Sequence, residues 1–148
     1  MTLQNGDPAP DFTLPDQDGA PFTLSARRGE RLLLVFYPGD NTPVCTRQLC
    51  EYRDGIEEFA GLGVTVIGIS RDDAESHRKF RSRHALPFTL LSDPDLQVAA
   101  QYGCRGPLGM KRAVFLVDAK GIIRYAHIEA LSLFRRRKDE LLAVLAAE

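Results

Sequence analysis

Three short stretches of mainly apolar residues divide the chain at wide intervals. They are Leu32–Phe36, Val64–Ile69 and Ala113–Val117, all rich in leucine, isoleucine, valine and phenylalanine. None shows the strict apolar–polar alternation of a strand with one face in water. Short continuous apolar runs are typical of strands covered on both faces. The sequence therefore predicts three strands of a buried sheet.

A helical pattern joins the first two strands, from roughly Pro43 to Ala60. Apolar side chains recur there at helical spacing, at Leu49, Tyr52, Ile56 and Phe59. Pro43 suits the first turn of a helix and Thr42 suits its N-cap, whereas Gly61 and Gly63 end it. A strand–helix–strand unit of this length predicts parallel strands with a right-handed crossover.

The remaining elements follow from the same patterns. They are an N-terminal hairpin turning at Pro15–Pro21, a helix Ala74–His84, a strand Phe88–Leu91, a helix Pro94–Tyr102, a hairpin turn Asp118–Gly121 leading into a strand Ile122–Ile128, and a final helix from about Ser132. This order is that of a thioredoxin-type α/β fold with an N-terminal β-hairpin extension. We expect one domain over residues 1–148, because this length fits a single core.

Composition and charge exclude several classes of protein. With 44% hydrophobic residues, 26% charged residues and a net charge of −1, the chain resembles an ordinary soluble protein and lacks the basic excess of a nucleic-acid binder. No window approaches the ~20 apolar residues of a membrane span, and the N-terminus has no signal-peptide pattern. We therefore expect a cytoplasmic protein that binds neither nucleic acid nor membrane. The basic run Arg135–Lys138 is interpreted as a solvated helix face.

The chain has three cysteines, Cys45, Cys50 and Cys104. A Cys-x4-Cys pair in a reducing compartment indicates a catalytic, redox-sensing or metal-binding role rather than a structural disulfide. Cys45 follows a buried strand and two chain-breaking residues, which places it in the first turn of a helix. Free N–H groups and the helix dipole favour a thiolate there. A thiolate is a nucleophile, and a second thiol can capture its oxidised form, which indicates a cysteine-based redox enzyme.

The motif Pro38-x-x-x-Thr42-x-x-Cys45 resembles the active-site signature of peroxiredoxins. Cys50 resembles the resolving cysteine of the peroxiredoxin Q subfamily, also called bacterioferritin comigratory protein. Val44 is a departure, because many relatives have glycine before the cysteine. Other segments similar to the family are Gly6–Phe12, Leu86–Phe88, Leu91–Asp93, Tyr102-Gly103 and Arg112–Asp118.

The resemblance implies a peroxidase without cofactor or metal that reduces hydrogen peroxide and organic hydroperoxides. Cys45 would become a sulfenic acid, Cys50 would resolve it as a disulfide, and thioredoxin or a similar dithiol protein would recycle the enzyme. Thr42 would donate to the thiolate and contact the peroxide. Arg112 would stabilise negative charge on sulfur and on the departing oxygen. Pro38 would shield the thiol from water, and the subfamily implies a monomer.

The two cysteines cannot bond while the helix between them is intact. Five residues of helix give a rise of ~7.5 Å and place the two Cα atoms roughly 8.6 Å apart. Disulfides rarely tolerate more than ~7 Å. The first one or two turns must therefore unwind in each catalytic cycle.

Each assigned residue also has a purely structural interpretation. Cys45 would then be a core cysteine, Thr42 only an N-cap, Arg112 a surface residue and Pro38 a strand terminator. Cys104 matches no motif and is interpreted as incidental. We expect His77 and His84, on one face of a helix, to lie at the surface, and His127 to lie in a strand.

Three other functions compete with the peroxidase. A thioredoxin-like disulfide reductase would need Cys-x-x-Cys and a proline before the third core strand, where this chain has Lys111-Arg112. A zinc module would need four ligands at a recognisable spacing, which the sequence does not offer. A redox sensor would share the first chemical step and differ from an enzyme in turnover.

Overall fold

A five-stranded mixed sheet forms the centre of the computed structural model, which describes residues 3–40, 43–107, 109–129 and 143. The strand order is β5-β4-β3-β8-β9, and β3, β4 and β5 run parallel while β8 and β9 are antiparallel to their neighbours. The strands are β3 (Arg31–Phe36), β4 (Val64–Ser70), β5 (Thr89–Ser92), β8 (Ala113–Val117) and β9 (Ile123–Ile128).

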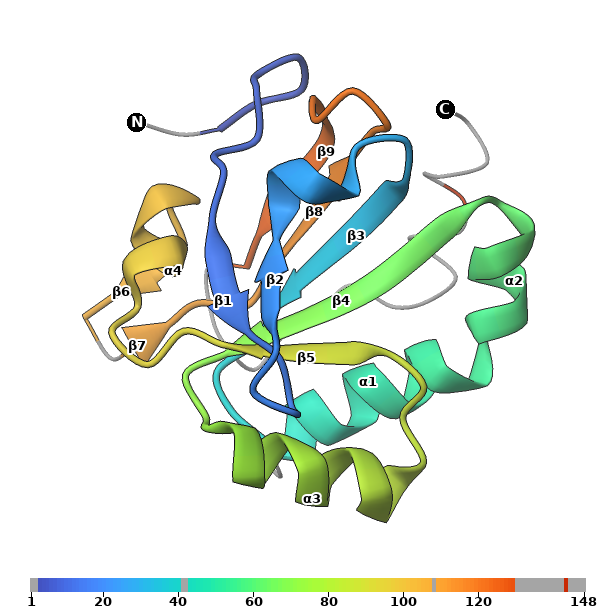
Figure 1. Cartoon of the computed structure of the whole chain (residues 1–148), viewed down its shortest axis with the longest axis vertical. Helices are drawn as coiled ribbons and strands as arrows, with labels where there is room; N and C mark the ends of the chain where they lie inside the picture. Colours follow the sequence, from blue (N-terminus) through green and yellow to red (C-terminus); the bar gives the residue numbers. More distant parts are fainter. Residues whose placement is uncertain (1–2, 41–42, 108, 130–142, 144–148) are drawn as a thin grey trace.

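Helices and two small hairpins surround this sheet (Figure 1). The helices are α1 (Pro43–Asp54), α2 (Ile56–Gly61), α3 (Ala74–His84), α4 (Gln97–Gln101) and the 3-10 helix η1 (Leu24–Arg27). The hairpins pair β1 (Thr13–Pro15) with β2 (Pro21–Thr23) and β6 (Arg105–Gly106) with β7 (Gly109–Met110). No helix of the described residues is both long and apolar enough to cross a membrane.

Successive residues of β3 point into two different cores. Leu33 and Val35 contribute to one core, together with side chains of α1, α2 and α3; we call it the helix-side core. Leu34 and Phe36 contribute to the other, together with side chains of β1, β2 and α4; we call it the hairpin-side core. Both faces of the sheet are thus covered, which explains the unbroken apolar runs of the central strands.

Most predicted elements are present at or near their predicted positions. The three core strands differ from prediction by at most one residue at either end, and the helix over Ala74–His84 matches. Asp73 caps that helix by accepting from the Ser76 N–H, and Ala85 closes it in a left-handed conformation. Both hairpins predicted from turn residues are also found.

Two predicted helices differ from the structure. The predicted helix Pro43–Ala60 is two helices separated at Gly55, because glycine is a weak helix former. The predicted helix Pro94–Tyr102 is reduced to α4, because Leu96 has φ of 57° and the Asp93 carboxylate accepts from the N–H groups of Val98 and Ala99. The predicted helix from Ser132 and the basic run within it lie outside the described residues.

Candidate active site

The candidate nucleophile lies where β3 gives way to α1. After Phe36 the chain passes through Pro38 and Asp40 and enters α1 at Pro43. Cys45 is therefore in the first turn of α1, and its side chain is fully buried, with 0% exposure. The position is at the carboxyl end of a central parallel strand, the edge where α/β proteins commonly build their sites.

Arg112 lies directly against the Cys45 thiol. Its neighbour Ala113 pairs with Phe36 in the antiparallel register of β8 and β3, so the start of β8 meets the end of β3. Arg112 is 2% exposed, and its Nη1 donates to the Cys45 Sγ at 3.1 Å. A guanidinium is permanently charged, so this contact stabilises negative charge on the sulfur. The interpretation of Arg112 as a surface residue is wrong.

Gln48 completes this arrangement and was not predicted from the sequence. It is fully buried, its Oε1 accepts from Arg112 Nη1 at 2.9 Å, and its Nε2 donates to the Tyr52 hydroxyl at 3.1 Å. Gln48 follows Cys45 by three residues and precedes Tyr52 by four, so all three side chains share one face of α1. The sequence did offer one signal for Gln48, because it is a polar residue within an otherwise apolar stripe of the helix.

The other predicted site residues lie on the same segment of chain. Pro38 is half-buried in the loop between β3 and α1, and Cys50 is half-buried further along α1. No cysteine is in a disulfide, and Cys45 and Cys50 both lie within the intact helix α1. An intact helix of this geometry keeps their Cα atoms farther apart than a disulfide tolerates. Thr42 lies outside the described residues.

Cys104 occupies a very different environment. It is fully buried in the hairpin-side core, whereas Cys45 belongs to the helix-side core. Burial and, to a smaller extent, the charge of Asp93 raise the pKa of Cys104 from its ordinary value to about 12. Its thiol is therefore protonated at neutral pH and is a poor nucleophile.

The histidines are placed differently from the sequence expectation. His77 is fully buried, so the prediction of a surface position is wrong; its Nδ1 lies 2.8 Å from the Asp40 carboxylate. His84 is half-buried, and its ring packs edge-on against Phe80 at a centroid distance of 5.1 Å. His127 lies in β9 as predicted. Among the described residues, no three histidine, cysteine or acidic side chains gather as a metal site.

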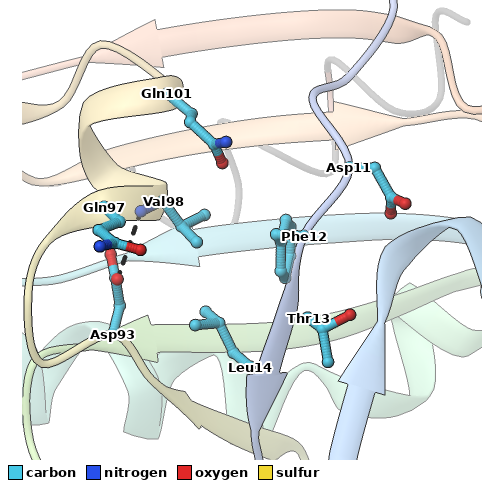
Figure 2. A pocket seen from close by; sticks show the side chains of 8 residues that line it. All are labelled: Asp11, Phe12, Thr13, Leu14, Asp93, Gln97, Val98 and Gln101. Carbon is cyan, nitrogen blue, oxygen red and sulfur yellow. Dashed lines mark hydrogen bonds between the residues drawn. The ribbon is translucent and has the colours of Figure 1, made fainter.

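A surface hollow of about 210 Å³ lies away from the thiol, between β1 and α4 (Figure 2). Its lining residues are Asp11, Phe12, Thr13, Leu14, Asp93, Gln97, Val98 and Gln101. Figure 2 shows the Asp93 carboxylate turned toward the backbone of Val98, to which it is hydrogen-bonded. The described lining offers neither a thiol nor a cation, so this hollow does not suit peroxide chemistry.

Comparison with known proteins gives consistent matches along most of the chain. Residues 5–126 match the AhpC/TSA family. A chloroplastic peroxiredoxin Q of Oryza sativa subsp. japonica is 42% identical over 128 residues, which cover 84% of this chain. The chain spans only 59% of the length of that relative.

Two solved structures are close in fold. The peroxidoxin BcpB of Mycobacterium tuberculosis superimposes with a TM-score of 0.88 and 36% identity, covering 98% of this chain and 97% of that one. A Xanthomonas campestris bacterioferritin comigratory protein, described in connection with alkyl peroxide reduction, gives a TM-score of 0.84 and 28% identity over 92% of this chain and 90% of that one. These likenesses confirm the predicted thioredoxin-type α/β fold.

Proposed function

The chain belongs to the AhpC/TSA family of peroxiredoxins, and from that premise we propose that it is a thiol peroxidase acting on hydrogen peroxide and organic hydroperoxides. The observation that carries the proposal is the 3.1 Å contact between Arg112 Nη1 and the Cys45 Sγ. It pairs a thiol in the first turn of a helix with a buried, permanent cation, which is the environment of a reactive cysteine.

The first step is attack of the Cys45 thiolate on one oxygen of the peroxide. A sulfur–oxygen bond forms and the O–O bond breaks; the second oxygen leaves with the electron pair and takes a proton to become water or an alcohol. Cys45 is oxidised by two electrons to a sulfenic acid. Arg112 stabilises negative charge as it moves from sulfur to the leaving oxygen. Gln48 accepts from the guanidinium and so holds its orientation.

The second step joins Cys50 to Cys45. The Cys50 thiolate attacks the sulfenic sulfur, a disulfide forms, and the hydroxyl group leaves as water after taking a proton. The first turns of α1 must unwind for the sulfurs to meet, because an intact helix holds them too far apart. A dithiol protein such as thioredoxin then reduces the disulfide by thiol–disulfide exchange. Within this scheme Pro38 limits access of water, and Thr42 donates to the thiolate and contacts the peroxide.

A coupled assay tests the proposed function. Peroxide consumption is measured with thioredoxin, thioredoxin reductase and NADPH, first with hydrogen peroxide and then with an alkyl hydroperoxide. We expect continuous turnover that depends on the enzyme and on thioredoxin. A single stoichiometric oxidation without turnover would instead indicate a redox sensor, and no reaction of Cys45 with either peroxide would contradict the proposal altogether.

Replacing Cys50 separates the two steps. Cys50→Ser should react once with peroxide at near wild-type speed, because Cys45 and Arg112 remain, and its turnover with thioredoxin should collapse. The stranded sulfenic acid should then gain a further oxygen as peroxide rises, which mass spectrometry detects as a sulfinic acid. Normal turnover of this variant would exclude Cys50 as the resolving residue.

Wild-type protein provides the matching observation. Its oxidation should remove two hydrogens and speed amide exchange between residues 42 and about 53, because α1 must open. Unchanged exchange in the oxidised protein would contradict the unwinding step.

A further inference from the structure

A buried polar network lies beside the loop that leads into the catalytic helix. Its centre is Asp40, five residues before Cys45, whose side chain is 1% exposed. The Asp40 Oδ1 accepts from the Tyr37 hydroxyl at 2.7 Å, and its Oδ2 accepts from the Ser76 hydroxyl and lies against His77 Nδ1, both at 2.8 Å. The backbone N–H of Asp40 donates to Asp72 Oδ2 at 2.7 Å.

The hydrogen bonds of this network limit where its protons can lie. Its Nε2 lies 3.0 Å from the Leu91 carbonyl, which can only accept, so Nε2 carries a proton. Burial, then the charge of Asp40, raise the pKa of Tyr37 well above its ordinary value, so Tyr37 also remains a donor. Asp40 therefore receives donors on both oxygens, and a proton must also lie between its Oδ2 and His77 Nδ1. An imidazolium with a carboxylate and a neutral imidazole with a protonated carboxyl both place that proton correctly. Because Tyr37 and Ser76 donate to the two oxygens of Asp40, and such donors favour a carboxylate, we assign the first arrangement.

The network ties the loop to three other elements of the fold. Ser76 and His77 belong to α3, Leu91 belongs to β5, and Asp72 follows β4, where it also accepts from the Ser70 hydroxyl. Among the titratable neighbours in the described residues, Asp40 lies directly against His77, and Tyr37 and Asp72 are linked to it through Asp40. A buried ion pair adds little stability compared with apolar packing. What these contacts do is join the loop residue Asp40 to α3.

We propose that His77 is a positioning residue for peroxide reduction, acting through Asp40 to hold the β3–α1 loop so that Cys45 stays against Arg112. The proposal rests on the proposed function, and His77 itself touches neither peroxide nor sulfur in it. The pair contacts the loop from the α3 side, whereas Arg112 reaches Cys45 from the start of β8, which pairs with β3 in the sheet. Loss of either hold would let the thiol move relative to the guanidinium.

Two variants test the assignment of the proton as well as the role. His77→Gln removes the cation and cannot reproduce both ring contacts. Asp40→Asn is nearly isosteric: its amide can donate to a neutral His77 Nδ1 and to the Ser76 hydroxyl, while its carbonyl still accepts from Tyr37. Asp40→Asn should therefore keep the loop in place without the shared proton. His84→Gln is the matched control, because the His84 ring lies on the same helix and outside the network.

The first readout is the single-turnover rate of Cys45 oxidation by hydrogen peroxide, followed by mass spectrometry at neutral pH in folded protein. His77→Gln should lose on the order of tenfold to a hundredfold, the effect of misplacing a reacting group by about 1 Å. Asp40→Asn should stay within a few-fold of wild type, and His84→Gln should match it. Equal rates for wild type and His77→Gln, or a loss in Asp40→Asn as large as that in His77→Gln, would overturn the proposal.

The second readout needs no peroxide and is independent of the proposed function. In 15N spectra, the His77 ring should show both nitrogens protonated in the wild type and only Nε2 protonated in Asp40→Asn. A His77 ring in the wild type with one bare nitrogen at neutral pH would overturn the ion-pair assignment. If His77→Gln fails to fold, His77→Asn replaces it in the rate measurement, and the 15N spectra of Asp40→Asn still decide the proton assignment. If wild-type Cys45 does not react with peroxide, the proposed function fails. The rate at which iodoacetamide alkylates Cys45 then still shows whether these variants change the position of the thiol.

Discussion

Cys45 and Cys104 are equally buried and lie on opposite faces of one sheet. Cys45 has the Arg112 guanidinium at 3.1 Å from its sulfur. Cys104 has an apolar surrounding and the negative charge of Asp93, and its pKa rises to about 12. Equal burial thus leaves the two thiols in different electrostatic surroundings, and the proposed function makes the one beside the cation the nucleophile.

Two consecutive residues, Lys111 and Arg112, contact the two cysteines. The backbone N–H of Lys111 donates to the Cys104 carbonyl, and the side chain of Arg112 donates to the Cys45 sulfur. The segment that leads into β8 therefore contacts the Cys104 backbone through Lys111 and the Cys45 sulfur through Arg112. The following predictions test that contrast, from the largest expected effect to the smallest.

Removing the proposed nucleophile should have the largest effect. Cys45→Ser should reduce peroxidase activity below about a hundredth of wild type, because a serine hydroxyl is far less acidic than a thiol. Circular dichroism should show that the fold survives, and the coupled peroxide assay gives the rate. Activity above a few per cent would mean that another cysteine reacts with peroxide.

Removing the charge beside Cys45 should come next. Arg112→Ala should slow sulfenic acid formation on the order of a hundredfold, and Arg112→Lys by less, because lysine keeps a charge and loses the planar fork. Alkylation of Cys45 by iodoacetamide at neutral pH should also be slower in Arg112→Ala.

Lys111 offers a control for that measurement. Lys111→Ala removes an exposed neighbouring cation and should leave both rates close to wild type. If Lys111→Ala slowed the reaction as much as Arg112→Ala, general positive potential rather than the direct contact would explain the activation.

Removing the hydrogen bond between Gln48 and Arg112 should slow the reaction less than removing Arg112. Gln48→Met keeps the length of the side chain and removes the oxygen that accepts from Arg112 Nη1 at 2.9 Å. We expect a loss of roughly tenfold in the single-turnover rate, because one charge-assisted hydrogen bond contributes about 1.5–3 kcal/mol at most and Arg112 remains in place. Tyr52→Phe, which removes the hydroxyl that accepts from Gln48 Nε2, should lose less than Gln48→Met. The reverse order would contradict a role for Gln48 in orienting Arg112.

The sheet was predictable from the sequence because each central strand is covered on both faces. Leu32–Phe36 reads as apolar throughout, since alternate residues enter two different cores. The break at Gly55 was not predictable from spacing, because Ile56 and Phe59 continue the helical rhythm of Tyr52 across the glycine. The local pattern of apolar residues therefore predicted where helices and strands lie better than it predicted where a helix is interrupted.

The site was only partly predictable, because its contacts join distant parts of the chain. Arg112 lies 67 positions from Cys45, and only the family resemblance suggested their contact. His77 lies 37 positions from Asp40, and no local pattern links a histidine on a helix to a carboxylate in a loop. Gln48 was within reach of sequence reasoning, since it breaks the apolar stripe beside Cys45. Buried polar pairs of this kind need the three-dimensional structure.

The smallest effect on activity should come from Cys104. We expect Cys104→Ser to turn over normally in the coupled assay, because the wild-type thiol stays protonated at neutral pH and lies on the other side of the sheet. Its cost should appear in stability instead, at about 1–3 kcal/mol, because the serine hydroxyl enters an apolar core. Peptide mapping of oxidised wild type should find Cys45 joined to Cys50, and a main product joining Cys45 to Cys104 would remove the distinction between the two buried thiols.

The pH dependence of stability gives Cys104 a signature of its own. Its pKa is raised in the folded protein from an ordinary value of 9.0 to about 12, so between these values the unfolded chain releases a proton that the folded chain keeps. The contribution of this thiol to stability is therefore full below about pH 9 and is lost progressively as pH rises through about 12. Urea unfolding at pH 8 and pH 10 should show wild type losing more stability over this interval than Cys104→Ser, which has no thiol to ionise. Equal losses would mean that Cys104 ionises as easily in the fold as outside it, and that the two buried cysteines differ less than their surroundings indicate.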